Sequence, residues 1–289
     1  MKSIVLALTF IALIIGACSS PVQPIVNTPA VKNQETELPT GTFTPPPSQT
    51  PTTEPTTTFT PRPTVDLALV LTPPSTVEYE IDYLALKTTD DVMIMGKQFG
   101  QGELAVILAH QGTTGANQRD WEPFARMLAE RGYTAATLDF RGRGQSQGDI
   151  SSTNLLILDM RAMIDHLRES GYKRLVCIGA SMGGSTCLRA AVEYDLEGLV
   201  VIGSMMSNGD PTRTRPEELA ALEMPKFFIT TENDRYPEIP SAIRSMYEIS
   251  QEPRLLRVFP GEAHGTEMFN QPYGEQFTAE LLAFLEMLR

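Results

Sequence analysis

Six short apolar runs constrain the fold of this chain more than any other feature. They are separated by segments long enough for a helix, and they occupy residues 104–109, 134–139, 175–178, 199–202, 227–230 and 255–259. Apolar runs of this length that alternate with helical segments are typical of parallel strands covered by helices on both faces. The pattern therefore predicts an α/β fold built on a mostly parallel sheet.

A hairpin is predicted ahead of these runs. Residues 77–83 and 92–95 alternate between apolar and polar side chains, and they flank turn-forming residues 88–91. Helical periodicity between the runs predicts helices on the sheet. The first predicted helix has an apolar face formed by Trp121, Phe124, Met127 and Leu128. The second has an apolar face formed by Leu156, Met160, Met163, Ile164 and Leu167. We expect eight strands, antiparallel at the start and parallel after.

The amino terminus has the layout of a secretory signal peptide. Lys2 precedes an apolar run over residues 4–15, which is short for a membrane span, and small residues lead to Cys18. The sequence Ile-Gly-Ala-Cys at residues 15–18 resembles a bacterial lipoprotein box. The resemblance implies cleavage after residue 17 and lipidation of Cys18, which would anchor an extracytoplasmic protein to a bacterial membrane. The alternative is an uncleaved anchor helix.

Residues 18–66 are predicted to be a disordered stalk. Within residues 19–64 the chain has 11 of its 22 prolines and 13 threonines, and it has few large apolar groups from which to build a core. Proline-rich segments adopt extended, semi-rigid conformations. The remaining residues, 67–289, are expected to form one domain.

Charge and cysteine content narrow the possible partners. The formal net charge is −12, and it belongs to the chain from about residue 65 onward, because residues 1–64 hold three acidic and three basic residues. A nucleic acid partner is disfavoured, since phosphate binding needs the opposite sign.

Cys177 and Cys187 would pair only if a helix packs closely on the preceding strand, so we expect buried free thiols.

The pentapeptide Gly-Ala-Ser-Met-Gly at residues 179–183 follows the third of the six apolar runs. A serine between glycines at a strand-to-helix turn is the arrangement of a nucleophile whose hydroxyl is exposed above a sheet. The alternative is a glycine-rich loop without chemistry. Because ligands of such sheets bind at the carboxyl ends of strands, Ser181 is expected at the site.

Two further motifs strengthen this prediction. Leu-Ala-His-Gln-Gly occupies residues 108–112, and Leu-Asp-Phe-Arg-Gly-Arg-Gly-Gln-Ser occupies residues 138–146. With the serine motif in the same order, residues 77–289 resemble an α/β hydrolase. Gln111 departs from the glycine usual in that family. The resemblance implies an α/β-hydrolase fold with a Ser-Asp-His triad, and the short segment 204–225 leaves no room for a sizeable cap domain.

A serine hydroxyl needs a base to become a nucleophile, and the base is usually a histidine. Of the three histidines, His264 follows the last predicted strand in a loop between glycines and is assigned as the base. His166 falls within a helix and is expected to be a surface or packing residue. His110 occupies a position that supports the loop after its strand in the resembled family.

The acid that orients the base is expected between the serine and the histidine in the chain. Asp234 follows the run at residues 227–230 and matches the family position, while Glu232 and Asp210 are the alternatives. Asp139 also ends a predicted strand. The neighbouring glycines and Arg141 indicate a structural turn there, held by an internal ion pair.

An oxyanion hole requires backbone N–H donors aimed at the developing charge. Met182 begins the helix after the nucleophile and supplies one donor by position. The second is assigned to Gln111 or Gly112, and the glutamine side chain would add a donor or narrow the acyl pocket.

These residues predict a serine hydrolase of the carboxylesterase type that acts on esters or thioesters with small or accessible acyl groups. Peptidase or acyltransferase activity on the same triad is one alternative, and a non-catalytic ligand-binding lipoprotein is another. No metal-ligand cluster or phosphate loop occurs in the sequence, so neither a cofactor nor a metal is expected. Arg213 and Arg215 are expected on a solvated loop, and the protein is expected to be a monomer.

Overall fold

The computed structural model describes residues 78–151, 153–206 and 214–289. The described residues form one compact unit, which lies within Pro61–Arg289. The predicted signal peptide and stalk, together with Cys18, Asp210 and Arg213, lie outside the described residues.

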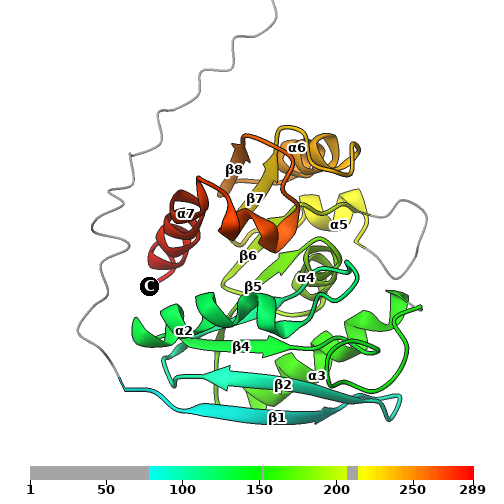
Figure 1. Cartoon of the computed structure of the whole chain (residues 1–289), viewed down its shortest axis with the longest axis vertical. Coiled ribbons are helices and arrows are strands. Elements are labelled where there is room, and N and C mark those ends of the chain that lie inside the picture. Colours follow the sequence, from blue (N-terminus) through cyan, green and yellow to red (C-terminus); the bar gives the residue numbers. More distant parts are fainter. Residues whose placement is uncertain (1–77, 152, 207–213) are drawn as a thin grey trace, which may run out of the picture. The chain divides into compact units, whose positions relative to one another are not determined.

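An eight-stranded sheet forms the centre of the domain, as predicted (Figure 1). Its strands lie in the order β1-β2-β4-β3-β5-β6-β7-β8. β1 and β2 pair antiparallel, β2 pairs antiparallel with β4, and every other neighbouring pair is parallel. The bounds are β1 Ile81–Lys87, β2 Met93–Phe99, β3 Leu104–Ala109, β4 Thr134–Leu138, β5 Arg174–Ala180, β6 Gly198–Ile202, β7 Lys226–Thr231 and β8 Arg254–Phe259. All six apolar runs are parallel strands.

The amino-terminal hairpin is confirmed, but its first strand begins four residues later than the alternation suggested. β1 pairs with β2 from Ile81 opposite Phe99 to Lys87 opposite Met93. Its core face is formed by Leu84 and Leu86, whereas Tyr83 points the other way and is 75% exposed. β1 therefore begins at Ile81, because Ile81 pairs with Phe99 and Phe99 is the last residue of β2.

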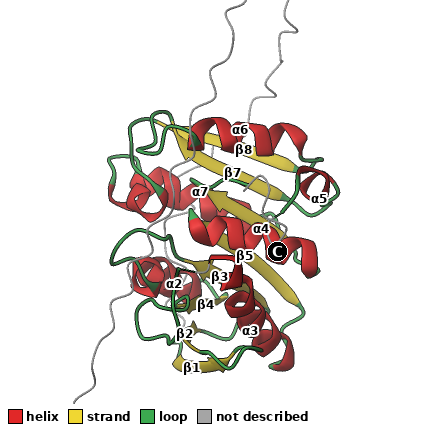
Figure 2. Cartoon of the chain, turned by 90° about the vertical axis from the view of Figure 1, so that its right-hand side faces the viewer, coloured by secondary structure: helices red, strands yellow, loops and turns green. Residues whose placement is uncertain are grey.

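Helices form one layer on each side of the sheet (Figure 2). On one side α3 (Leu156–Glu169), α4 (Met182–Glu193) and α6 (Ile239–Ile249) pack into one apolar core, while α2 (Glu122–Glu130) and α7 (Gly274–Glu286) pack into the other. The described residues also contain three 3₁₀ helices: η1 (Gln118–Trp121), η2 (Thr153–Leu155) and η3 (Gly265–Asn270). Within the described ranges, no helix is long and apolar enough to cross a membrane.

The connection from β6 to β7 contains α5 (Pro216–Ala220), which is the only helix among its described residues. Arg215 precedes α5 and is exposed, and its guanidinium lies 3.4 Å from a carboxylate oxygen of Glu217 and 3.0 Å from one of Glu218. Arg215 therefore lies on a solvated segment and is paired with carboxylates of that same segment. The described part of this connection is thus far smaller than a cap domain.

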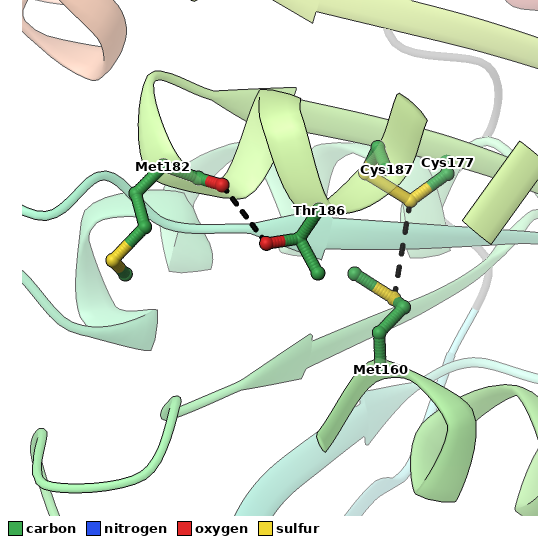
Figure 3. Close-up of a disulfide and its surroundings, with 5 residues drawn as sticks. All are labelled: Met160, Cys177, Met182, Thr186 and Cys187. Carbon is green, nitrogen blue, oxygen red and sulfur yellow. Dashed lines mark hydrogen bonds between the residues drawn. A yellow bond between two sulfur atoms is a disulfide. The ribbon is translucent and has the colours of Figure 1, made fainter. Parts of the chain in front are cut away.

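The prediction of free thiols at Cys177 and Cys187 is wrong, because the two form a disulfide between β5 and α4 (Figure 3). Their Cα atoms are 5.6 Å apart, within the range that a disulfide can span. The close approach comes from the glycines around the turn. A Cβ atom on Gly179 would lie 2.3 Å from the Gly183 carbonyl oxygen, so α4 packs directly on the backbone of β5.

Replacing both Cys177 and Cys187 with alanine is expected to lower the free energy of unfolding by about 3 kcal/mol, since a crosslink across a short loop restricts the unfolded chain. The thermal midpoint should fall by roughly 6–12 °C in a domain of this size. Circular dichroism melting of the full chain measures both quantities, with Cys18→Ser as the matched control. If Cys18→Ser protein that is unfolded without reductant titrates with two free thiols, the disulfide does not exist.

Candidate active site

The turn between β5 and α4 holds Ser181 in a left-handed backbone conformation, with φ 50° and ψ −115°. Asp91 is the only other described non-glycine residue with positive φ. Such a conformation costs about 1–3 kcal/mol and persists only where the surrounding structure enforces it. Here α4 packs against the end of β3, where a Cβ atom on Gly183 would lie 2.3 Å from the Ala109 carbonyl oxygen.

Hydrogen bonds from β6 and the residues that follow it hold the backbone of Ser181. Its N–H donates to the Ile202 carbonyl at 2.8 Å, and the Ser204 hydroxyl donates to its carbonyl at 2.7 Å. Ser204 in turn contacts the Ser185 hydroxyl at 2.9 Å. Sequence reasoning missed Ser204 and Ser185, although the position of Ser204 directly after a predicted strand was a usable signal.

His264 lies in the loop between β8 and η3, next to Asp234 from the loop after β7. Its Nδ1 is 2.9 Å and 3.0 Å from the two carboxylate oxygens of Asp234. His264 is 1% exposed and Asp234 is 4% exposed. The Tyr236 N–H donates to the same carboxylate at 3.0 Å. Because a carboxylate only accepts, Nδ1 carries the proton and Nε2 keeps its lone pair.

The Nε2 atom of His264 is buried and has no hydrogen-bond partner among the described residues. His264 and Ser181 line the same cavity, so this nitrogen is the unpaired acceptor of the site. The Tyr236 ring packs edge-on against the imidazole, with ring centroids 4.7 Å apart. The tyrosine and Asp234 together set the orientation of the imidazole.

Of the alternative carboxylates, Glu232 is exposed and Asp210 lies outside the described residues. The Glu232 backbone N–H donates to the Phe259 carbonyl at 2.8 Å. Asp234 is the carboxylate that contacts the imidazole of His264.

The loop after β3 brings Gly112 next to Met182, the first residue of α4. A Cβ atom on Gly112 would lie 3.1 Å from the Met182 sulfur. The N–H of Met182 has no acceptor within its helix, since the first turn of a helix leaves its donors free. The positive end of the helix dipole also favours a negative charge there.

The suggestion that the Gln111 side chain adds a donor or narrows the acyl pocket is wrong. Its Oε1 accepts from the Thr266 N–H at 2.9 Å, and its Nε2 donates to the Thr113 hydroxyl at 3.0 Å. Gly265 makes room for it with φ +59°, since a Cβ atom there would lie 2.0 Å from Oε1. The glutamine therefore ties the loop after β3 to the loop that carries His264.

A cavity of about 430 Å³ opens at these residues. Apolar side chains from four segments line much of it: Ile150, Leu156, Ile157, Met182, Met205 and Ile239. Charged groups from Arg143, Arg189 and Glu238 also reach it. A concave apolar site with few polar groups at the serine suits a small organic ligand.

Comparisons with known proteins agree with this architecture. The esterase Pf2001 of Pyrococcus furiosus superposes with a TM-score of 0.61 and 20% identity, which covers 74% of this chain and 98% of that one. The strand order, the helices on both sides and the serine turn after β5 are shared features of that architecture. The chain has the α/β-hydrolase fold.

The sequence of the chain is similar to those of known hydrolases. A family model described as serine aminopeptidase, S33, matches residues 102–233. The uncharacterized protein YfhR of Escherichia coli is 25% identical over 203 residues, which are 63% of this chain and 70% of that protein. A carboxylesterase of Bacillus subtilis is 31% identical over 104 residues, which are 35% of this chain and 42% of the relative. Together these similarities support a hydrolase.

His110 supports the loop after β3 of this α/β-hydrolase fold. Its Nδ1 donates to the Gln111 carbonyl at 2.7 Å, and its Nε2 accepts from the Phe140 N–H at 3.1 Å. Burial lowers the pKa of His110 to about 4, so the imidazole is neutral. His166, in contrast, lies half-buried on α3 and does not line the cavity.

Stability is expected to fall as the pH drops from about 6.5 to about 4 because of His110. Its pKa is about 4 in the folded state and near 6.5 in the unfolded state, so the unfolded state binds more protons in that window. The expected loss is about 2–3 kcal/mol by pH 4. Denaturant unfolding at several pH values measures it. A His110→Gln variant should lose this component of the slope, and an unchanged slope would contradict the assignment.

The turn after β4 is structural, as predicted, but its ion pair is not the expected one. Asp139 accepts from the Gln118 N–H, the Gln118 amide and the Gln145 N–H, each at 2.9 Å. Arg141 instead pairs with the buried Asp159 of α3 and with Asp90, both at 2.7 Å. The guanidinium of Arg141 lowers the pKa of Asp90 to about 2. The sequence carried no signal for these pairs, because their partners are distant along the chain.

No group of three or more His, Cys, Asp or Glu side chains in the described ranges is arranged to hold a metal ion.

Proposed function

We propose that this protein is a serine hydrolase of carboxylic esters or thioesters, with Ser181 as nucleophile, His264 as base and Asp234 as the acid that orients the base. The observation that carries the proposal is the buried, unpaired Nε2 of His264 at the cavity that also holds Ser181. A neutral imidazole whose Nδ1–H is held by a carboxylate is the base that activates a serine hydroxyl.

The reaction follows from these groups. The Ser181 hydroxyl oxygen bonds to the acyl carbon while its proton passes to His264 Nε2. The resulting oxyanion accepts hydrogen bonds from the N–H of Met182 and from the N–H of Gln111 or Gly112, and each such donor contributes about 3–4 kcal/mol. The tetrahedral intermediate then collapses, and the leaving alcohol or thiol takes the proton from His264. Water repeats the sequence on the acyl-enzyme and releases the acid.

Asp234 acts through His264. Both of its oxygens lie within hydrogen-bond distance of Nδ1, and both side chains are buried, so the carboxylate stabilises the imidazolium that forms after proton transfer. The apolar lining of the cavity favours an acyl or alcohol group with a hydrocarbon part. The described residues between β6 and β7, which are 203–206 and 214–225, contain no large insertion that could cover the cavity. This favours small or accessible substrates.

A fluorophosphonate probe tests the nucleophile directly. We expect covalent labelling of the wild-type protein and none of Ser181→Ala, with mass spectrometry placing the adduct on Ser181. A panel of p-nitrophenyl esters, thioesters and aminoacyl p-nitroanilides then separates esterase from peptidase activity. Folded wild-type protein that neither labels nor hydrolyses any member of the panel would be a non-catalytic binding protein.

We propose further that the domain is displayed outside the cytoplasm on a stalk of residues 18–66, anchored to a bacterial membrane through lipidated Cys18. The Cys177–Cys187 disulfide supports this location, since stable disulfides persist in oxidising compartments. Metabolic labelling with an alkyne fatty acid should mark the wild-type chain and spare Cys18→Ser. Recovery of both proteins in the soluble fraction would contradict the anchor. In detergent, we expect the protein to be a monomer by light scattering.

A further inference from the structure

Arg143 reaches the cavity from the turn after β4. It lines the same cavity as Ser181 and His264. Its Nη2 donates to the Gly112 carbonyl at 2.9 Å, which places the guanidinium against the loop next to Met182. The positive charge of Arg143 is therefore beside the acyl-transfer site.

The guanidinium of Arg143 makes no ion pair with any of the described residues. No carboxylate of the described residues lies within 4 Å of it, and its Nε is buried without a hydrogen-bond partner there. A buried donor that lacks an acceptor costs about 1–3 kcal/mol. Within the part of the chain that the structure describes, Arg143 is therefore an unpaired cation at the cavity.

Arg189 shows what a neutralised arginine at this cavity looks like. Its Nε lies 2.7 Å from Glu193, and its Nη1 lies 3.3 Å from Glu218. Both arginines line the cavity, but Arg189 is paired with two carboxylates, which it shares with Arg161 and Arg215. Glu238, the remaining charged group of the lining, is exposed and makes no ion pair with Arg143.

We propose that Arg143 is a specificity-determining residue that binds a carboxylate of the substrate, so that the preferred substrates are esters carrying a free carboxylate. This inference rests on the proposed function of the same site. An arginine presents planar, paired N–H donors that match a carboxylate, and no carboxylate of the described residues is paired with those of Arg143.

Two matched substrate pairs test the proposal on the full-length protein. Monoethyl adipate and its primary amide, ethyl 6-amino-6-oxohexanoate, place the charge or its neutral analogue on the acyl side. 4-Acetoxybenzoate and 4-acetoxybenzamide place it on the alcohol side. The measured quantity is the ratio of kcat/KM for the carboxylate to kcat/KM for the amide within each pair.

We expect a ratio of about 10–100 in at least one pair for the wild-type protein, the range expected of a charge-assisted hydrogen bond. The pair that shows it identifies the side of the ester on which Arg143 lies. Arg143→Gln keeps an N–H donor for the Gly112 carbonyl but lacks the charge, so its ratio should fall close to one. Arg143→Lys should retain part of the preference. Arg244→Gln, which removes an exposed arginine of α6, is the control and should leave the ratio unchanged.

Loss of activity by Arg143→Gln on both members of a pair, at an unchanged ratio, would mean that Arg143 only positions the Gly112 loop, and it would overturn the proposal. A wild-type ratio near one would do the same, even with full fluorophosphonate labelling of Ser181, so failure here is distinct from failure of the hydrolase function.

Binding supplies a readout without turnover: thermal stabilisation of Ser181→Ala by monoethyl adipate or 4-acetoxybenzoate should exceed that by its amide and should require Arg143. Equal stabilisation by both members of each pair, or none, overturns the proposal.

Discussion

The Ser181→Ala variant is expected to lose esterase activity by about 10⁴-fold or more, because the nucleophile and base act as a unit and no covalent intermediate forms without the hydroxyl. The loss should appear in kcat. KM or the substrate dissociation constant should change little, since the cavity lining stays the same. Steady-state hydrolysis of a p-nitrophenyl ester by the purified protein measures the effect.

The structure makes this variant a clean test. Alanine removes only the hydroxyl, and the backbone of residue 181 stays held by the Ile202 carbonyl and the Ser204 hydroxyl. Its thermal midpoint should therefore match that of the wild type within 1–2 °C, roughly the change produced by less than 1 kcal/mol. Residual activity within tenfold of the wild type, in protein free of wild-type carry-over, would exclude Ser181 as the nucleophile.

The Asp234→Asn variant is expected to lower kcat by about 10³- to 10⁴-fold with little change in KM. Asparagine fits the same space, but its amide can donate to Nδ1 of His264. This stabilises the tautomer with the proton on Nε2, which can no longer accept the proton of Ser181.

Glu232→Gln is the matched control for Asp234→Asn, because it neutralises the exposed carboxylate two residues earlier. We expect less than a twofold change in kcat. The reverse result, a large loss with Glu232→Gln and near wild-type activity with Asp234→Asn, would assign the acid to Glu232. If both variants keep their activity, Asp210 becomes the acid to test.

The parallel strands and the serine turn could be predicted because their signals are local. Each apolar run from residue 104 onward is a strand, and the glycines around Ser181 allow a backbone conformation that other residues would block. The first strand was placed four residues too early, since its start depends on pairing with Phe99 at the end of β2. Pairing partners are not encoded within a single run.

The contacts around the candidate site depended on elements far apart in the chain. Asp234 and His264 are separated by 30 residues, and the hydrogen bond from Thr266 to Gln111 joins residues 155 apart. The direction of the Gln111 side chain and the pairing of Arg141 with Asp159 were mispredicted for this reason. Arg143 gave no sequence signal either, because an unpaired charge can be recognised only when its surroundings are known.

The sequence by itself determined the fold class, the order of strands and helices along the chain and the position of the serine turn, because apolar periodicity and the steric demands of glycine act over a few residues. Only the tertiary structure decided how close α4 packs on β5, which makes Cys177 and Cys187 a disulfide, and which carboxylate meets His264. It also decided that Arg143 reaches the cavity without a carboxylate partner among the described residues. Those outcomes depend on distances of a few ångströms between segments that only the folded sheet brings together.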